Sequence, residues 1–129
     1  PKEPNVNEYP IYGVCACEVI IDILTGQHIV NRVDLLEDVG RSMSPLVDIG
    51  QVEGAFIMGL GYYTTEEIVY NYEGKILTDR TWNYRPPGAK DIPVDFRVQL
   101  KKNNPNPVGV LYSKGNYRFR RCVRTNTKG

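Results

Sequence analysis

The hydrophobic period of the chain changes once, close to Gly40, and this change limits the folds that the sequence can adopt. Before it, residues 12–39 alternate loosely between apolar and polar side chains and are rich in β-branched residues, with a turn signal at Thr25-Gly26. Two long strands around a short glycine turn predict an antiparallel hairpin over this range. Charged side chains at alternate positions indicate a sheet with one face in water.

Beyond Gly40, apolar residues recur at every third or fourth position, which is the period of an amphipathic helix. Ser44 is a suitable N-cap and Pro45 a suitable first residue, so we expect a helix from about Pro45 to Tyr62. The apolar stripe consists of Ile49, Val52, Phe56, Leu60 and Tyr63. Four glycines lie in or beside this helix: Gly50, Gly54, Gly59 and Gly61. Each costs about 1 kcal/mol relative to alanine, so their number indicates that something approaches the helix backbone closely.

The rest of the chain predicts shorter strands. Residues 67–78 read as a second hairpin around Glu73-Gly74, residues 95–101 as a cleanly alternating strand, and residues 108–112 as a short closing strand. Residues 80–93 contain too much proline for a central strand or a helix. The predicted fold class is therefore α+β, with antiparallel hairpins packed on one long glycine-rich helix.

Length and composition place the chain among intracellular globular proteins. With 129 residues and 41% hydrophobic residues, it corresponds to one domain or to a piece of a larger one. We favour a fragment or a processed chain, since the first residue is Pro1. No apolar run has the length of a membrane span, and the N-terminus lacks the form of a signal peptide. Three cysteines are an odd number, and Cys15 and Cys17 are poorly spaced for disulfides or zinc, so a reducing, cytoplasmic compartment is expected.

Charge is distributed unevenly along the chain. Residues 1–113 carry a balance of −5, whereas residues 114–129 carry +6 with no acidic residue. This shift predicts a boundary between a domain at 1–113 and a basic tail at 114–129 that is disordered or aberrant. The tail is either an arm for nucleic acid or a short basic end. We favour the second interpretation, and expect no nucleic-acid partner, because nothing upstream supplies another basic surface.

Few residues of the sequence suggest catalysis or metal binding. His28 is the only histidine and lies just after a turn, where an exposed side chain is the usual case. Without a second histidine, the three cysteines Cys15, Cys17 and Cys122 assemble no metal site. We therefore predict no metal ligand in this chain.

Gln51 is the strongest candidate for ligand contact. At 100° per residue it shares a helix face with Gly54 and Ala55, which leave space beside its amide. The amide offers both a hydrogen-bond donor and an acceptor, which suits a heterocycle or a phosphate-bearing group. In the alternative interpretation, the glycines serve tight packing of the helix on a strand, and Gln51 lies at a satisfied edge.

The helix region resembles a known enzyme family. Residues 39–61, and more loosely residues 12–113, are similar to the molybdopterin-binding C-terminal region of the xanthine dehydrogenase and aldehyde oxidase family. The most specific part is the run Gly50-Gln51-Val52-Glu53-Gly54. Residues 81–98 look closer to aldehyde oxidases of invertebrate type than to xanthine dehydrogenases. The resemblance identifies residues 1–113 as a partial molybdopterin-binding domain.

The resemblance implies a function and a cofactor site. Members of this family use molybdenum held by a pterin to hydroxylate aldehydes or N-heterocycles with oxygen from water. The glutamine of the helix motif contacts the pterin, so Gln51, with Gly50 and Gly54 beside it, is the expected cofactor-binding set. The 2Fe-2S clusters and FAD are expected only in the full-length enzyme, which is expected to be a cytoplasmic homodimer.

The sequence departs from the family after Lys114. Family members continue there into a Gly-Glu-Pro-Pro segment, whose glutamate is the catalytic base. Here Gly115 begins a run without any carboxylate, and no Asp or Glu follows Asp95. We therefore assign no catalytic residue to this chain. Two interpretations stay open: a fragment of a molybdenum hydroxylase, or an inactive remnant that acts only as a binding or structural module.

Overall fold

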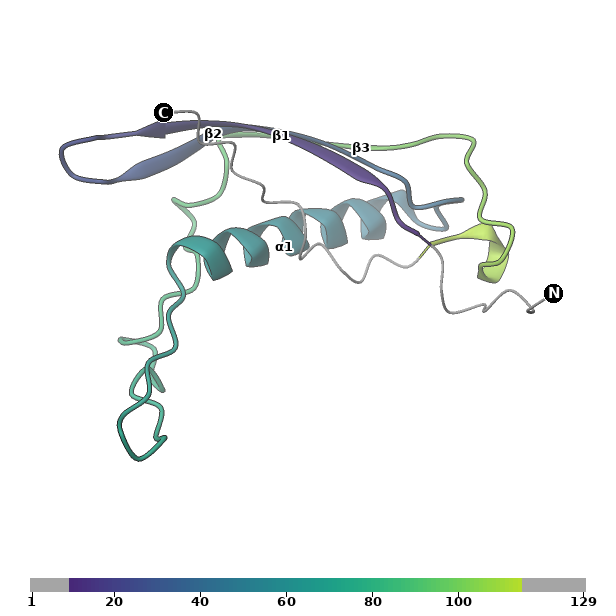
Figure 1. Ribbon diagram of the computed structural model, residues 1–129. Coiled ribbons are helices and arrows are strands. Elements are labelled where there is room, and N and C mark those ends of the chain that lie inside the picture. Colours follow the sequence, from purple (N-terminus) through teal and green to yellow (C-terminus); the bar gives the residue numbers. More distant parts are fainter. Residues whose placement is uncertain (1–9, 115–129) are drawn as a thin grey trace.

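A computed structural model describes residues 10–114 as a small sheet lying over one helix (Figure 1). The three strands have the order β1-β2-β3, so the fold is α+β. The elements are β1 (Gly13–Ile21), β2 (His28–Glu37), α1 (Pro45–Thr64), β3 (Asp95–Leu100) and the 3-10 turn η1 (Val110–Tyr112).

Strands β1 and β2 form the antiparallel hairpin that the sequence predicts. Their register runs from Gly13 opposite Glu37 to Ile21 opposite His28, with one irregularity after Glu18. In the turn, the carboxylate of Asp22 accepts hydrogen bonds from the backbone N–H of Leu24 and the hydroxyl of Thr25, and Gly26 has a φ of 74°. A positive φ is cheap for glycine, which explains the Thr-Gly signal at this place.

Helix α1 also matches its prediction, ending two residues later than expected. Its side facing the sheet supplies Val52, which joins three residues of β2 in the buried core, namely Val30, Val33 and Leu35. Phe56 packs edge-on against Phe96 of β3, with ring centroids 5.1 Å apart. Of the predicted apolar stripe, Tyr63 is the exception, since 55% of its surface is exposed.

Strand β3 lies where predicted but in the opposite direction. It pairs with β2 in parallel, from Arg32 opposite Asp95 to Glu37 opposite Leu100, so the expectation of antiparallel strands throughout is wrong. The cause is the connection. Helix α1 and residues 65–94 carry the chain back to the end of the sheet where β2 begins, and such a crossover makes the two strands parallel.

Two shorter elements differ from the prediction. Residues 67–78 keep the expected turn, where Gly74 has a φ of 80°, but form only one isolated bridge, Tyr70 to Ile76, instead of two strands. Residues 110–112 form η1 rather than a strand, because Leu111 and Tyr112 have φ values of 52° and 62°. Alternation of apolar residues does not reveal such backbone angles.

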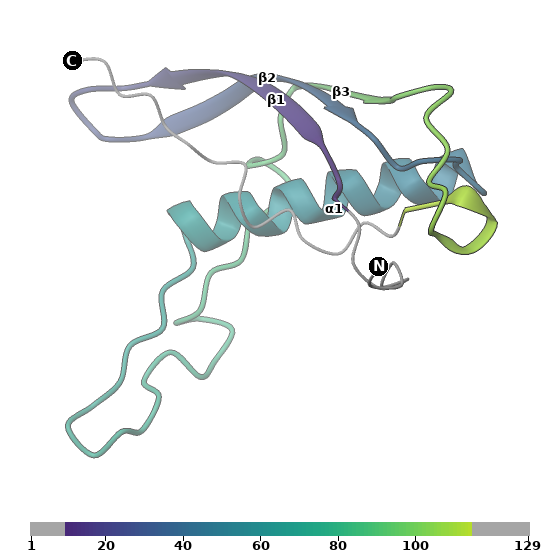
Figure 2. The same ribbon diagram turned by 45° about the vertical axis from the view of Figure 1, so that its right-hand side comes forward.

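Within residues 65–94, the chain first extends away from the sheet and the helix, below the C-terminal end of α1, and then returns to the start of β3 (Figure 2). Several large apolar side chains are exposed there, including Tyr72 and Trp82. No helix within residues 10–114 combines the length and the hydropathy needed to cross a membrane.

Candidate functional site

The face of α1 that points away from the core is open over residues 47–58 and covered at Gly61, near the C-terminal end of the helix. A methyl group added at Gly50 or Gly54 would meet no atom within 4 Å, whereas at Gly61 it would collide with Pro87 and Glu66. Glycine is therefore required by packing within this chain at Gly61, but not at Gly50 or Gly54. This geometry excludes tight packing on a strand of residues 10–114 as the reason for the two N-terminal glycines.

Gln51 lies between these glycines with its side chain exposed. Among residues 10–114 its amide has no hydrogen-bond partner. At 100° per residue, one arc of the helix surface holds Val47, Gly50, Gln51, Gly54 and Met58, which we call the glycine face. Val47 and Met58 are 59% and 74% exposed.

The glycine face combines apolar side chains, bare backbone and one amide. Such a surface can receive a flat heterocycle by close approach and bind its edge through a donor and an acceptor. Since none of its five residues titrates, the face is suited to binding and orienting a ligand rather than to transferring a proton.

A second arrangement of polar groups lies at the start of α1 and was not predicted from the sequence. The ammonium of Lys114 contacts the carboxylate of Asp38 at 2.7 Å, and these side chains are only 9% and 4% exposed. The N–H of Gly40 donates to the same carboxylate at 3.0 Å, and the amide of Asn104 donates to it as well. We call these four residues the Asp38 cluster.

The balance of these contacts sets the charge of Asp38. Burial acts to raise its pKa, but the hydrogen bonds from Lys114, Gly40 and Asn104 outweigh it and hold the pKa below the ordinary value of 3.8. Lys114 is the first residue of the predicted basic tail, and the rest of that tail lies outside the described residues. A lysine and an aspartate 76 positions apart carry no local signal, which is why sequence reasoning missed the pair.

The other candidates from the sequence do not assemble a site. His28 begins β2 with its side chain exposed. The sulfur atoms of Cys15 and Cys17 are 3.5 Å apart on β1, and Cys122 lies outside the described residues. Within residues 10–114, no group of three or more His, Cys, Asp or Glu side chains is placed to hold a metal ion.

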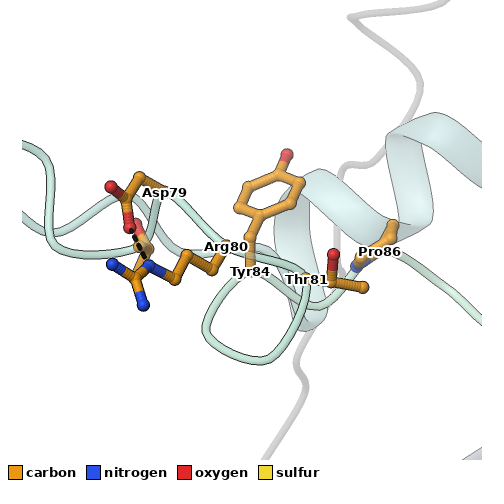
Figure 3. A pocket seen from close by; sticks show the side chains of 6 residues that line it. Asp79, Arg80, Thr81, Tyr84 and Pro86 are labelled. Carbon is orange, nitrogen blue, oxygen red and sulfur yellow. Dashed lines mark ion pairs between the residues drawn. The ribbon is translucent and has the colours of Figure 1, made fainter.

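A shallow pocket of about 350 Å³ lies in the segment beyond α1 (Figure 3). Its lining is Thr78, Asp79, Arg80, Thr81, Tyr84 and Pro86. The Tyr84 hydroxyl donates a hydrogen bond to Glu66 at 2.5 Å, which raises the pKa of Tyr84, and Arg80 lies 3.8 Å from Asp79. Because these polar groups are engaged with one another, the pocket fits a structural role.

Comparison with known proteins decides the family. Residues 1–93 match the model of the molybdopterin cofactor-binding domain. The chain belongs to this family. It is 46% identical over 110 residues to the xanthine dehydrogenase/oxidase of Rattus norvegicus and 41% identical over 110 residues to an indole-3-acetaldehyde oxidase of Arabidopsis thaliana, each match covering 85% of this chain. The xanthine dehydrogenase and aldehyde oxidase resemblance is thereby confirmed, whereas the invertebrate type stays a prediction.

A solved structure shows the same fold. The quinoline 2-oxidoreductase of Pseudomonas putida 86 superposes with a TM-score of 0.71 at 29% identity, covering 78% of this chain and 13% of that one. The chain spans only 8% of the length of the two relatives named above.

Proposed function

We propose that this chain forms one part of the molybdopterin site of a molybdenum-dependent oxidoreductase that hydroxylates aldehydes or N-heterocycles with oxygen from water. The observation that carries the proposal is the glycine face, where bare backbone and the unpartnered amide of Gln51 are presented together. Membership of the molybdopterin cofactor-binding domain family supports it. The names of the relatives, which include aldehyde and xanthine oxidising enzymes, support the substrate class.

The residues present fit the cofactor. A pterin is a flat heterocycle with donors and acceptors along its edge, and the glycine face offers the space at Gly50 and Gly54 together with the amide of Gln51. When bound, the molybdenum cofactor supplies the redox chemistry and the oxygen transfer. The part of this chain is to bind the pterin through Gln51 and to admit it close to the helix backbone.

We place the other groups of such an enzyme outside this site. The 2Fe-2S clusters, the FAD and the contacts of the expected homodimer are assigned to other segments of the longer protein. The catalytic base is assigned there too, because no carboxylate follows Asp95 in this sequence.

A segment exchange tests the proposal. Residues 10–114 replace the matching segment of the rat xanthine dehydrogenase/oxidase, and the purified chimera is assayed for molybdenum and for pterin per protein. Gln51→Ala removes the amide, and Gln99→Ala is the matched control, since Gln99 is an exposed glutamine on β3. Loss of one partner of a buried hydrogen bond costs about 1–3 kcal/mol, so Gln51→Ala should lower cofactor content roughly tenfold while Gln99→Ala leaves it unchanged.

The outcomes separate the two open functions. A chimera that retains cofactor and loses it on Gln51→Ala supports a cofactor-binding chain. A chimera that folds but never retains molybdenum, with or without Gln51, would support the alternative of an inactive binding or structural module.

A further inference from the structure

The Asp38 cluster joins parts of the chain that are far apart in sequence. Asp38 follows β2, Asn104 follows β3, and Lys114 follows η1. The ammonium of Lys114 also lies 5.9 Å from the centre of the Tyr12 ring, just before β1. Every oxygen of the Asp38 carboxylate is hydrogen-bonded, as a buried charge requires.

Hydrogen bonds between backbone groups hold the chain beside the cluster. The N–H of Lys114 donates to the carbonyl of Val39, and the N–H of Arg41 donates to the carbonyl of Tyr112, both at 2.8 Å. Gly40 has a φ of 67°, and a side chain there would collide with the Tyr112 carbonyl. The end of the segment 101–114 is therefore fixed against the connection between β2 and α1.

Hydrophobic burial does not account for this arrangement. Leu111 and Tyr112 are 61% and 53% exposed, yet both adopt positive φ values that are unfavourable for residues other than glycine. Such angles persist only where surrounding contacts over-determine them, and they gather at sites where position matters. The contacts here are those of the Asp38 cluster with its backbone hydrogen bonds, and those of the buried Asn106, whose N–H donates to the Tyr112 carbonyl at 2.9 Å and whose side-chain amide donates to the Ser113 carbonyl at 3.1 Å.

The fixed segment lies at the end of α1 that carries Gln51. Figures 1 and 2 show η1 beyond the N-terminal end of α1, next to the connection from β2 that its hydrogen bond with Arg41 holds, and Gln51 is in the second turn of the helix. We propose that Asp38 and Lys114 are positioning residues of the cofactor site: their ion pair sets where the chain leaves residue 114 relative to the glycine face. This inference rests on the proposed function, because it assigns the pair a role in the reaction of that site.

The test uses the same chimera of residues 10–114 in the rat xanthine dehydrogenase/oxidase. Lys114→Met removes the charge and keeps the length of the side chain, Lys114→Arg keeps the charge, and Lys90→Met is the control at an exposed lysine. For each protein we measure hydrogen exchange in residues 37–44 and 101–114, molybdenum content, and kcat and KM for xanthine per bound molybdenum. The assays are run well below the melting temperature.

The expected results are specific. Lys114→Met should speed exchange in both segments by about a hundredfold and lower kcat per molybdenum by about a hundredfold, with a much smaller change in KM. Lys114→Arg should restore most of kcat, and Lys90→Met should match the unsubstituted chimera.

A second variant covers the case in which Lys114→Met fails to fold because Asp38 is left as an unpaired buried charge. The double variant Asp38→Asn with Lys114→Met removes both charges, so it should fold while still showing the low kcat. A loaded Lys114→Met or double variant with fast exchange and unchanged kcat per molybdenum would show a purely structural pair and overturn this inference alone. An unsubstituted chimera without molybdenum would overturn the proposed function, and this inference with it.

Discussion

Two regions around α1 differ in whether their side chains are buried and hydrogen-bonded by other residues of this chain. In the closed region, which comprises the Asp38 cluster and the core under the sheet, Val52 is fully buried and the Asp38 carboxylate has three donors. In the open region, the glycine face, the amide of Gln51 has no partner within residues 10–114, and Gly54 has empty space beside it. The described residues thus cover the closed region and leave the glycine face exposed.

Large apolar side chains are also exposed in other parts of the molecule. Ile23 and Leu24 at the tip of the β1–β2 turn are each 92% exposed, and Trp82 is 87% exposed. Isolated domains rarely present so many large apolar side chains, which normally mark contact surfaces. A chain that spans 8% of the length of its relatives is expected to pack these surfaces against other segments of a longer protein.

The largest effect is expected in the closed region, at Asp38. Asp38→Ala leaves Lys114 buried without its partner, and breaking a buried ion pair costs about 3–5 kcal/mol. Urea unfolding of the 129-residue chain should show this loss, or no cooperative transition at all. Asp79→Ala is the control, because Asp79 is half exposed and its pair with Arg80 should contribute below about 1 kcal/mol. Equal effects of the two substitutions would remove the distinction between closed and open regions.

Acid should act on the same pair. Because the pKa of Asp38 is lowered in the folded chain, the folded state stabilises the ionised carboxylate. This stability is fully present above the unfolded value of 3.8 and is lost as the pH falls through the lower folded pKa. The free energy of unfolding should therefore decrease below about pH 4, and Asp38→Asn should flatten that part of the profile. The same acid slope in the Asn variant would contradict the assignment.

Two valines on α1 compare the regions directly. Val52→Ala removes two methyl groups from the core and should cost about 2 kcal/mol. Val47→Ala makes the same change on the glycine face, where Val47 is 59% exposed, and should alter the stability of the chain by less than about 0.5 kcal/mol. A large loss at Val47 in the isolated chain would mean that the face is already covered.

Local features of the fold could be predicted from the sequence, because local rules determine them. The Thr25-Gly26 turn, the start of α1 at Pro45 and the strand after Asp95 each have a short-range signal. The parallel direction of β3 and the turn η1 have none, since they depend on where a long connection returns the chain. For this reason the predicted strand at residues 108–112 was wrong.

The same division applies to the candidate site. Gln51 and its neighbouring glycines could be selected as candidates because they lie within one helical turn of each other, which the sequence shows directly; their role in cofactor binding stays a prediction. The structure adds that these glycines have no packing role within residues 10–114. The contact of Lys114 with Asp38 could not be predicted, because the two residues are 76 positions apart and meet only in the complete fold.

The most direct test of the open face is the cofactor content of the Gly54→Ala chimera, with Gly59→Ala as the matched control. Both glycines have empty space beside them, so each alanine should stabilise α1 in the 129-residue chain by about 1 kcal/mol. Only Gly54 lies on the glycine face. We predict that pterin and molybdenum per protein fall severalfold in Gly54→Ala and stay unchanged in Gly59→Ala. Equal, full cofactor content in both variants would contradict the claim that this face receives the cofactor.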